Sequence, residues 1–203
     1  MIDTATAACS VALIANGTVV AEQYRLVGRG HAEQLLPMIA ALPEGGRAQA
    51  ILVDCGPGSF TGIRVGLAAA RALALGWGVP VSGYSSLALL AARAFAQTPE
   101  HQAIAALLEG GHGEVFMQRF AAHPFAAVSG LESLPPAAAL DALGGVPAVG
   151  AGIKWLRTLA PALAGEEALP IARDAVLLPP GCVGLPPSPI YGRAPDAKPM
   201  TDP

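Results

Sequence analysis

The chain has 203 residues, of which 53% are hydrophobic and only 13% are charged, so it is long enough to build a substantial buried core. Its formal net charge is −3 with only 12 Lys and Arg, which argues against a surface that holds nucleic acid by neutralising many phosphates. The three cysteines form no C-x-x-C pair and no zinc-ligand spacing, so we expect free thiols and no metal. We also expect no cofactor.

The sequence shows no membrane-targeting feature. No apolar run reaches the length of a membrane span, and the first residues lack the basic and apolar regions of a signal peptide. We therefore expect a cytoplasmic protein that contacts no membrane and forms no stable complex with nucleic acid.

Predicted strands and helices alternate over the first half of the chain. A β-hairpin is expected over residues 9–26, because two strand-like segments flank Asn16-Gly17, a strong signal for a tight turn. The further elements follow from apolar periodicity and capping residues: a helix at 31–42, a buried strand at 50–54, a glycine loop at 56–62, a helix at 63–75, a strand at 80–83, and a helix capped by Ser85 or Ser86 that runs to about residue 95. This alternation predicts an α/β fold.

The second half is predicted to be a smaller α/β domain. Its expected elements are strands at 103–108 and 114–120, a helix at 133–143, a strand at 146–149 and a helix at 154–160. Beyond residue 164, frequent prolines predict irregular coil. The predicted domains are residues 1–97 and residues 98–203.

The loop at residues 56–62 is the most distinctive motif. Glycines between a strand end and a helix start are typical of anion sites, because backbone N–H groups can approach a ligand closely. The loop lacks the Gly-Lys-Ser/Thr of a Walker A motif, since Ile63 and Arg64 follow Gly62. A glycine turn with Ser59 or Thr61 as helix N-cap is an equally good interpretation.

A second candidate ligand site lies at the start of the chain. The turn at residues 3–6 carries a carboxylate and two hydroxyls, which either hold a phosphate-bound metal or cap the turn itself. Together the turn and the loop give one candidate phosphate-binding set: Asp3, Thr4, Thr6, Gly56, Gly58, Ser59 and Thr61.

The helices at 31–42 and 63–75 carry more apolar surface than one face requires. Small residues form a stripe on the second helix, which suits either interior packing or a partner helix. His31 has Leu35 four residues on, where a helical metal site needs a second histidine, so we expect no metal there. The candidate interface residues are His31, Leu35, Ile39, Gly62, Val65, Gly66 and Ala69.

Three segments together resemble the TsaB (YeaZ) family: residues 3–13 (DTATAACSVAL), 56–68 (GPGSFTGIRVGLA) and 85–87 (SSL). Residues 114–116 and 189–193 resemble two further stretches of that family. The resemblance implies an actin, sugar kinase and Hsp70-like fold with two related α/β domains, of which the second is shortened. Members of the family also begin a few residues earlier, which suggests a truncated first strand or an upstream start.

The resemblance also implies a function. TsaB-like proteins are non-catalytic subunits that pair the two helices described above with TsaD, the enzyme that forms threonylcarbamoyladenosine at position 37 of tRNAs reading ANN codons. The ATPase TsaE joins that pair, and a lone TsaB-like chain forms a homodimer through the same face. The alternative from another class is an ATPase or kinase-like enzyme of the same superfamily that uses the Asp3 turn and the loop at 56–62.

Overall fold

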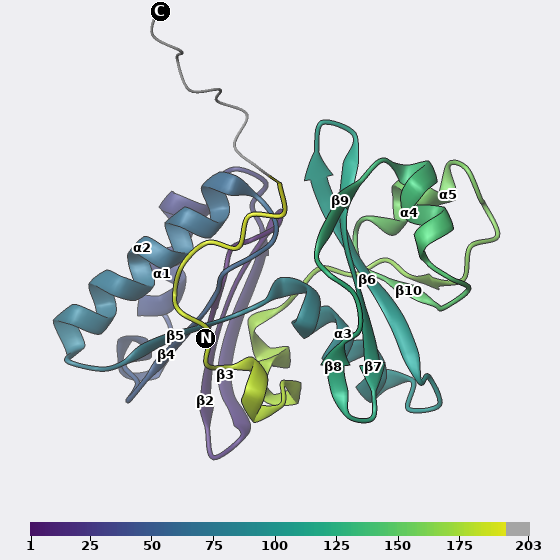
Figure 1. Ribbon diagram of the computed structural model, residues 1–203. Coiled ribbons are helices and arrows are strands. Elements are labelled where there is room, and N and C mark those ends of the chain that lie inside the picture. The colour runs from purple at the N-terminus through teal and green to yellow at the C-terminus, as the bar shows by residue number, and fades with distance from the viewer. Residues whose placement is uncertain (194–203) are drawn as a thin grey trace, which may run out of the picture.

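The computed structural model describes residues 1–193 and places two β-sheets side by side (Figure 1). The first sheet has the order β3-β2-β1-β4-β5. Its strands are β1 (Ile2–Asp3), β2 (Ala8–Ala15), β3 (Thr18–Leu26), β4 (Ile51–Asp54) and β5 (Val81–Tyr84). Strands β1, β2 and β3 pair antiparallel in turn, whereas β4 and β5 run parallel to β1.

The second sheet repeats the order and strand directions of the first. It runs β8-β7-β6-β10-β11, with β9 also paired to β7. Its strands are β6 (Ala103–Gly111), β7 (Glu114–Ala122), β8 (Phe125–Ala127), β9 (Glu132–Leu134), β10 (Ala148–Val149) and β11 (Gly165–Glu166). Strands β6, β7 and β8 pair antiparallel, and β10 and β11 run parallel to β6. The predicted α/β class is therefore confirmed, with two topologically related halves.

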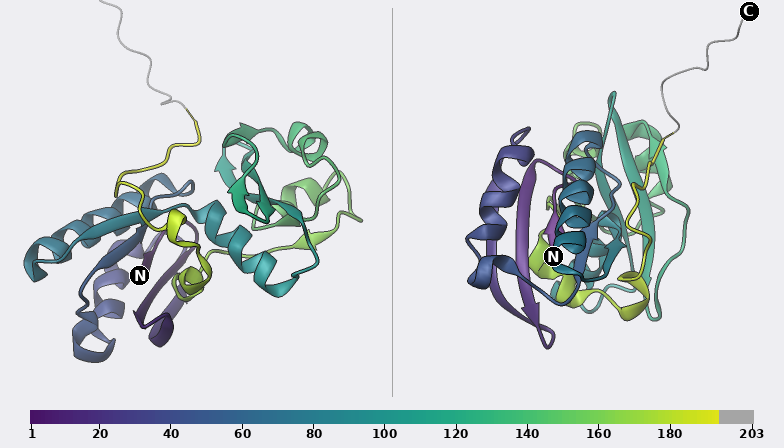
Figure 2. Two further views of the ribbon diagram at one scale, coloured as in Figure 1. Left: turned by 60° about the horizontal axis from the view of Figure 1, so that its bottom comes forward. Right: turned by 90° about the vertical axis from the view of Figure 1, so that its left-hand side faces the viewer.

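Helices cover the outer face of each sheet (Figures 1 and 2). On the first sheet these are α1 (His31–Ala40) and α2 (Phe60–Trp77), whose inward side chains share one core cluster with β1, β2 and β4. On the second sheet they are α4 (Pro136–Ala142) and α5 (Ile153–Arg157). A short 3-10 helix, η1 (Pro43–Gly46), follows α1.

Two segments exchange places between the halves. Helix α3 (Ser86–Gln97) follows β5 of the first sheet but packs against β6 and β7 of the second. Conversely, the 3-10 helix η2 (Ala172–Leu177) follows the second sheet and packs on β2 of the first, and η3 (Pro180–Cys182) comes next. The division into domains after residue 97 stays a prediction. Each of these two segments lies on one side of that division in the sequence and packs against the sheet of the other side. Residues 194–203 of the predicted second domain lie outside the described residues.

The C-terminal segment, residues 185–193, forms a strap across the molecule. Leu185 exchanges two backbone hydrogen bonds with Gly83, at 2.7 and 3.0 Å, and Ile190 N–H donates to Cys55 O at 2.7 Å. This region was predicted as irregular coil, and proline does keep it out of long regular elements. The strap nevertheless has defined partners on both halves, because Arg193 also approaches Glu114 of β7 at 3.6 Å.

Candidate functional site

The Asp3 turn and the glycine loop meet where β1 and β4 end. Ser59 N–H donates to Ala5 O at 2.6 Å, and Thr4 Oγ1 donates to Gly62 O at 2.7 Å. A Cβ at Gly58 would lie 2.1 Å from Ala5 O, closer than any side chain tolerates. The loop glycines therefore let two segments of this chain approach each other.

The N-cap of α2 settles one alternative left open by the sequence. Ser59 Oγ accepts a hydrogen bond from Gly62 N–H at 3.2 Å, so Ser59 is the N-cap and Thr61 is not. Helix α2 also begins earlier than predicted, at Phe60, and continues to Trp77.

The small-residue stripe of α2 faces the interior. An added Cβ would lie 2.0 Å from Thr4 O at Gly62 and 2.3 Å from Thr4 Oγ1 at Gly66. These two glycines allow α2 to pack closely on β1. The space beyond them is filled by Thr4, so they face the interior of this chain, and their assignment to a partner contact stays a prediction.

The residues predicted for the interface on α1 are also buried. Leu35 and Ile39 belong to the core of the first half. The Nε2 atom of His31 donates to backbone carbonyls of the Asp3 turn region, with Thr6 O at 2.8 Å and Ala8 O at 3.1 Å, a role that fixes the turn. All three are buried within this chain, and Val65 and Ala69 of α2 are half-buried against the same core. The assignment of these residues to a partner contact stays a prediction.

Other side chains of these two helices do face outward. Leu36 is 52% exposed on α1 and Leu75 is 87% exposed on α2. We call the outward apolar set the α1–α2 face: Leu36, Pro37, Ala40, Ala68, Ala72 and Leu75. This face was not predicted, because the inward and outward rows of both helices are apolar and periodicity alone does not say which row meets the sheet.

A buried polar cluster lies at the ends of β1, β4 and β5. Tyr84 Oη donates to Asp3 Oδ2 at 3.0 Å, and Ser86 Oγ lies 2.7 and 2.8 Å from the two carboxylate oxygens of Asp54. Asp54 also accepts from Gly56 N–H at 2.7 Å. The carboxyl groups of Asp3 and Asp54 lie close enough for each to influence the pKa of the other. The cluster fixes the loop and the start of α3 relative to the first sheet.

Burial raises the pKa of both carboxyl groups. The pKa of Asp54 rises to about 6, mainly because the charged form is desolvated. The pKa of Asp3 rises well above its usual value, first through desolvation and then through the nearby charge of Asp54. Both carboxyl groups therefore hold a proton more tightly than an exposed aspartate does.

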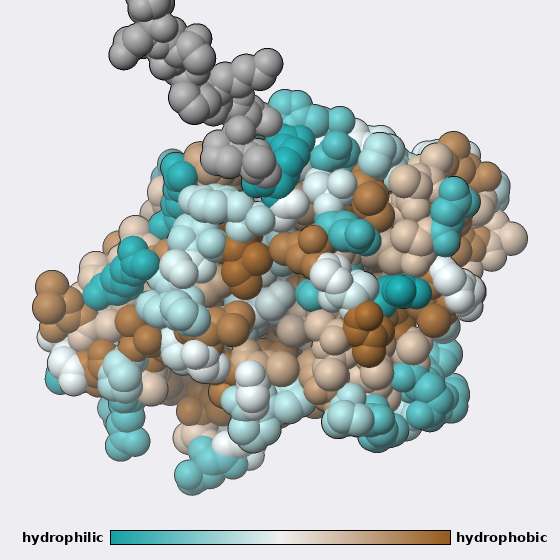
Figure 3. Space-filling model, viewed as in Figure 1, coloured by the Kyte–Doolittle hydropathy of each residue, from teal (hydrophilic) through white to brown (hydrophobic). Residues whose placement is uncertain are grey.

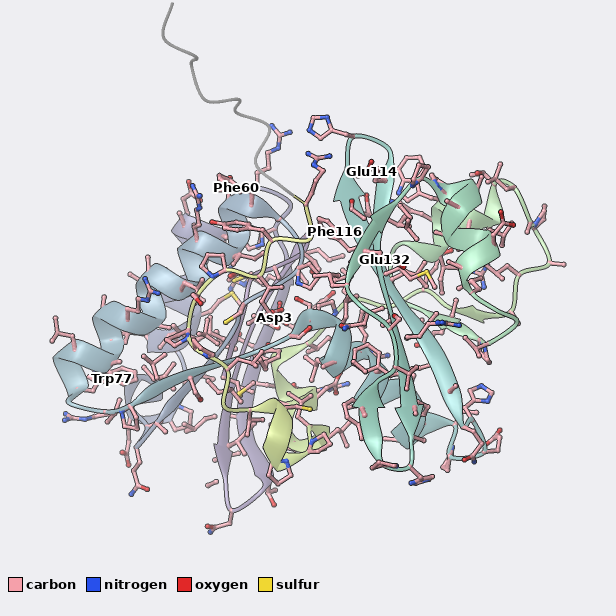
Figure 4. All side chains as sticks on the ribbon, viewed as in Figure 1. Asp3, Phe60, Trp77, Glu114, Phe116 and Glu132 are labelled. Atoms are coloured by element: carbon pink, nitrogen blue, oxygen red, sulfur yellow. The ribbon has the colours of Figure 1, made fainter. Side chains whose placement is uncertain are left out.

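A cleft of about 790 Å³ opens between the two halves, beside this cluster. Of the candidate phosphate-binding residues, Thr6, Gly58 and Ser59 line the cleft. Asp3, Thr4 and Gly56 are buried and bonded within the protein, and Thr61 lies on the exposed side of α2. The predicted set is thus divided, and its carboxylate does not reach the cleft. Figure 4 shows Asp3 among the strand ends, with Phe60 and Phe116 on the two halves.

Aromatic and cationic side chains meet at the rim of the cleft. The Cζ atom of Arg64 lies 3.6 Å from the ring centroid of Phe60, and its Nη2 donates to Tyr191 Oη at 3.0 Å. The two rings are 6.0 Å apart. This arrangement joins α2 to the strap and holds the guanidinium in one position.

Residues 1–193 hold neither a metal-ligand cluster nor a membrane-spanning helix. Within residues 1–193, no three His, Cys, Asp or Glu side chains gather as metal ligands. In the same part of the chain, no helix is both long and apolar enough to cross a membrane.

Comparison with known proteins places this architecture in a family. Residues 18–126 match the profile described as TsaD, tRNA N6-adenosine threonylcarbamoyltransferase. The chain is 40% identical over 124 residues to the tRNA threonylcarbamoyladenosine biosynthesis protein TsaB of Escherichia coli, an alignment that covers 59% of this chain and 53% of that protein. It also resembles the crystal structure of YeaZ from Pseudomonas aeruginosa, with a TM-score of 0.76, 29% identity, and coverage of 94% and 97%.

The chain belongs to the TsaB (YeaZ) family. A second structure from P. aeruginosa, described as similar to peptidase YeaZ, agrees with a TM-score of 0.77 and 30% identity over 95% of this chain and 97% of that one. The two related halves are those of the actin, sugar kinase and Hsp70-like fold, as the resemblance to the family implied. The match spans about half the length of the E. coli TsaB protein.

Proposed function

We propose that this TsaB-family chain is a non-catalytic subunit of the system that makes threonylcarbamoyladenosine in tRNA. Within that system it binds and supports TsaD, which modifies position 37 of tRNAs reading ANN codons, and the ATPase TsaE joins the pair. The chain itself makes no stable contact with tRNA. Support for the pathway comes from its membership of the TsaB family and from the TsaD profile that matches more than half of the chain.

The observation that carries the partner proposal is the α1–α2 face. Leucine side chains that are 52% and 87% exposed are costly to keep in water, and alanines between them let another helix approach closely. The homologous partner has the same fold, so helices of the same kind can pack against this face. The proposed contact with TsaD therefore uses the two predicted helices, α1 and α2, but through the outward residues of the α1–α2 face instead of the buried residues predicted from the sequence.

The test is the affinity for TsaD of the same organism, measured by a fluorescence titration. Ala68→Glu places a charge on the α1–α2 face without entering the core, whereas Gly66→Glu would clash with Thr4 and test folding instead. The control is Ala137→Glu on α4, also an exposed helical alanine. We expect Ala68→Glu to weaken binding at least about tenfold, because a charge would be desolvated in the contact. Unchanged affinity would remove the face from the proposal.

A second candidate, an ATPase or kinase-like enzyme, has one observation in its favour. Thr6, Gly58 and Ser59 line the cleft, where a phosphate would be held by backbone N–H groups. However, the side chains of Asp3 and Thr4 are hydrogen-bonded inside the protein and do not face the cleft. If the chain is a non-catalytic subunit, the purified chain should not turn over nucleotide. Nucleotide turnover that is lost in Ser59→Ala would favour the ATPase or kinase-like function.

A further inference from the structure

The interior of the cleft is mainly apolar. Its wall combines side chains from the first half, the second half and the strap, including Ala5, Ile63, Leu108, Phe116, Leu169 and Ile190. In the space-filling view, hydrophobic residues gather along the line where the two halves meet (Figure 3). A pocket of about 790 Å³ falls in the range of about 300–1,000 Å³ that holds small organic ligands.

The charged side chains that line this cleft favour an anion. Arg64 is held in place by Phe60 and Tyr191, as described above. Arg193 also lines the cleft, where it shares the carboxylate of Glu114 with Ser133. The acidic side chain of the lining, Glu109, is paired with Lys154 at 2.7 Å.

We propose that the cleft binds a small organic anion with an aliphatic body, such as a medium-chain carboxylate. The apolar wall removes the chain from water, and the Arg64 guanidinium receives the carboxylate in a charge-assisted hydrogen bond. A nucleotide fits this chemistry less well, because Asp3 and Thr4 are withdrawn into the protein and do not reach the cleft. This site is separate from the proposed contact with TsaD, and either proposal can fail alone.

The experiment titrates the purified chain with decanoate and, separately, with 1-decanol, by isothermal calorimetry. Arg64→Met removes the charge and keeps an unbranched side chain. We expect it to weaken decanoate binding at least tenfold and to change 1-decanol binding less than twofold. The matched control is Arg71→Met, because Arg71 is also exposed on α2 and also bonds the strap, through Pro187 O, but does not line the cleft.

A second variant tests the location. Ala7 is exposed and lines the cleft, so Ala7→Trp should fill the space without entering the core and abolish binding of both compounds. Thermal unfolding of each variant verifies that it is folded. The proposal is overturned if decanoate does not bind saturably, if Arg71→Met weakens it as much as Arg64→Met, or if Mg-ATP displaces decanoate at lower concentration than decanoate itself binds.

Discussion

Asp3 and Asp54 make the stability of this protein depend on pH. Both carboxyl groups bind their protons more tightly in the folded protein than in the unfolded chain, where the usual pKa is 3.8. A raised folded-state pKa gives stability at low pH that is lost as pH rises toward that pKa. The contribution of Asp54 should thus fall between about pH 4 and its folded pKa of about 6, and that of Asp3 should continue to fall at higher pH.

Asp3→Asn should flatten this dependence. The amide keeps the shape of the side chain but cannot ionise. The free energy of unfolding of the variant should therefore change less steeply with pH, by up to about 1.4 kcal/mol per pH unit. Denaturant unfolding at pH 5 and pH 8 measures the difference. We expect wild type to lose more stability over this interval than Asp3→Asn. Parallel losses would mean that Asp3 is ionised in the folded protein.

The buried glycines of α2 give a second residue-scale prediction. Gly66→Ala would place a Cβ 2.3 Å from Thr4 Oγ1, and overpacking of this kind costs about 1–3 kcal/mol. Gly76→Ala on the same helix meets no atom within 4 Å and should gain up to about 1 kcal/mol from helix propensity. Chemical denaturation compares the two. Equal effects would show that α2 does not pack closely on β1.

The site residues show what the sequence can and cannot predict. Ser59 was among the predicted caps, because a capping residue acts on the backbone next to it. The burial of His31 and Gly66 could not be predicted, because the groups they contact, the carbonyls of Thr6 and Ala8 and the side chain of Thr4, lie far away along the chain. The cluster of Asp54, Tyr84 and Ser86 was missed for the same reason, since three strand ends bring it together.

At the scale of elements, local signals worked where they were strong. The hairpin around Asn16-Gly17 and the helix capped by Ser85 form as predicted. The helix predicted at 133–143 forms as α4 but begins later, at Pro136, because residues 132–134 pair with β7 as strand β9. Strand β8 was also missed. The local sequence pattern does not show whether a short segment pairs with a strand elsewhere in the chain.

The strap gives a prediction at this scale. A chain that ends at Gly184 loses the hydrogen bonds of Leu185 and Ile190 to Gly83 and Cys55, each worth about 0.5–1.5 kcal/mol. Its free energy of unfolding, measured in denaturant, should be lower by at least about 2 kcal/mol. The control is a chain that ends at Arg193, which keeps every described contact. Equal stability of the two truncated chains would show that the strap does not hold the halves together.

At the scale of the whole molecule, two related halves enclose a cleft, and the first half presents an apolar face outward. Exposed apolar helices favour association, and a lone chain can satisfy them with a second copy of itself. We therefore propose that homodimer and TsaD complex compete for the α1–α2 face. In that case Ala68→Glu weakens both assemblies, whereas Ala137→Glu weakens neither.

We propose that this chain works as a partner subunit of TsaD. The most direct measurement is size-exclusion chromatography with light scattering on the chain, on TsaD of the same organism, and on their mixture at matched concentrations. We predict that a one-to-one complex replaces the homodimer of the chain in the mixture. Two peaks with the masses and elution volumes of the separate proteins would show that the chain is not a partner subunit of TsaD.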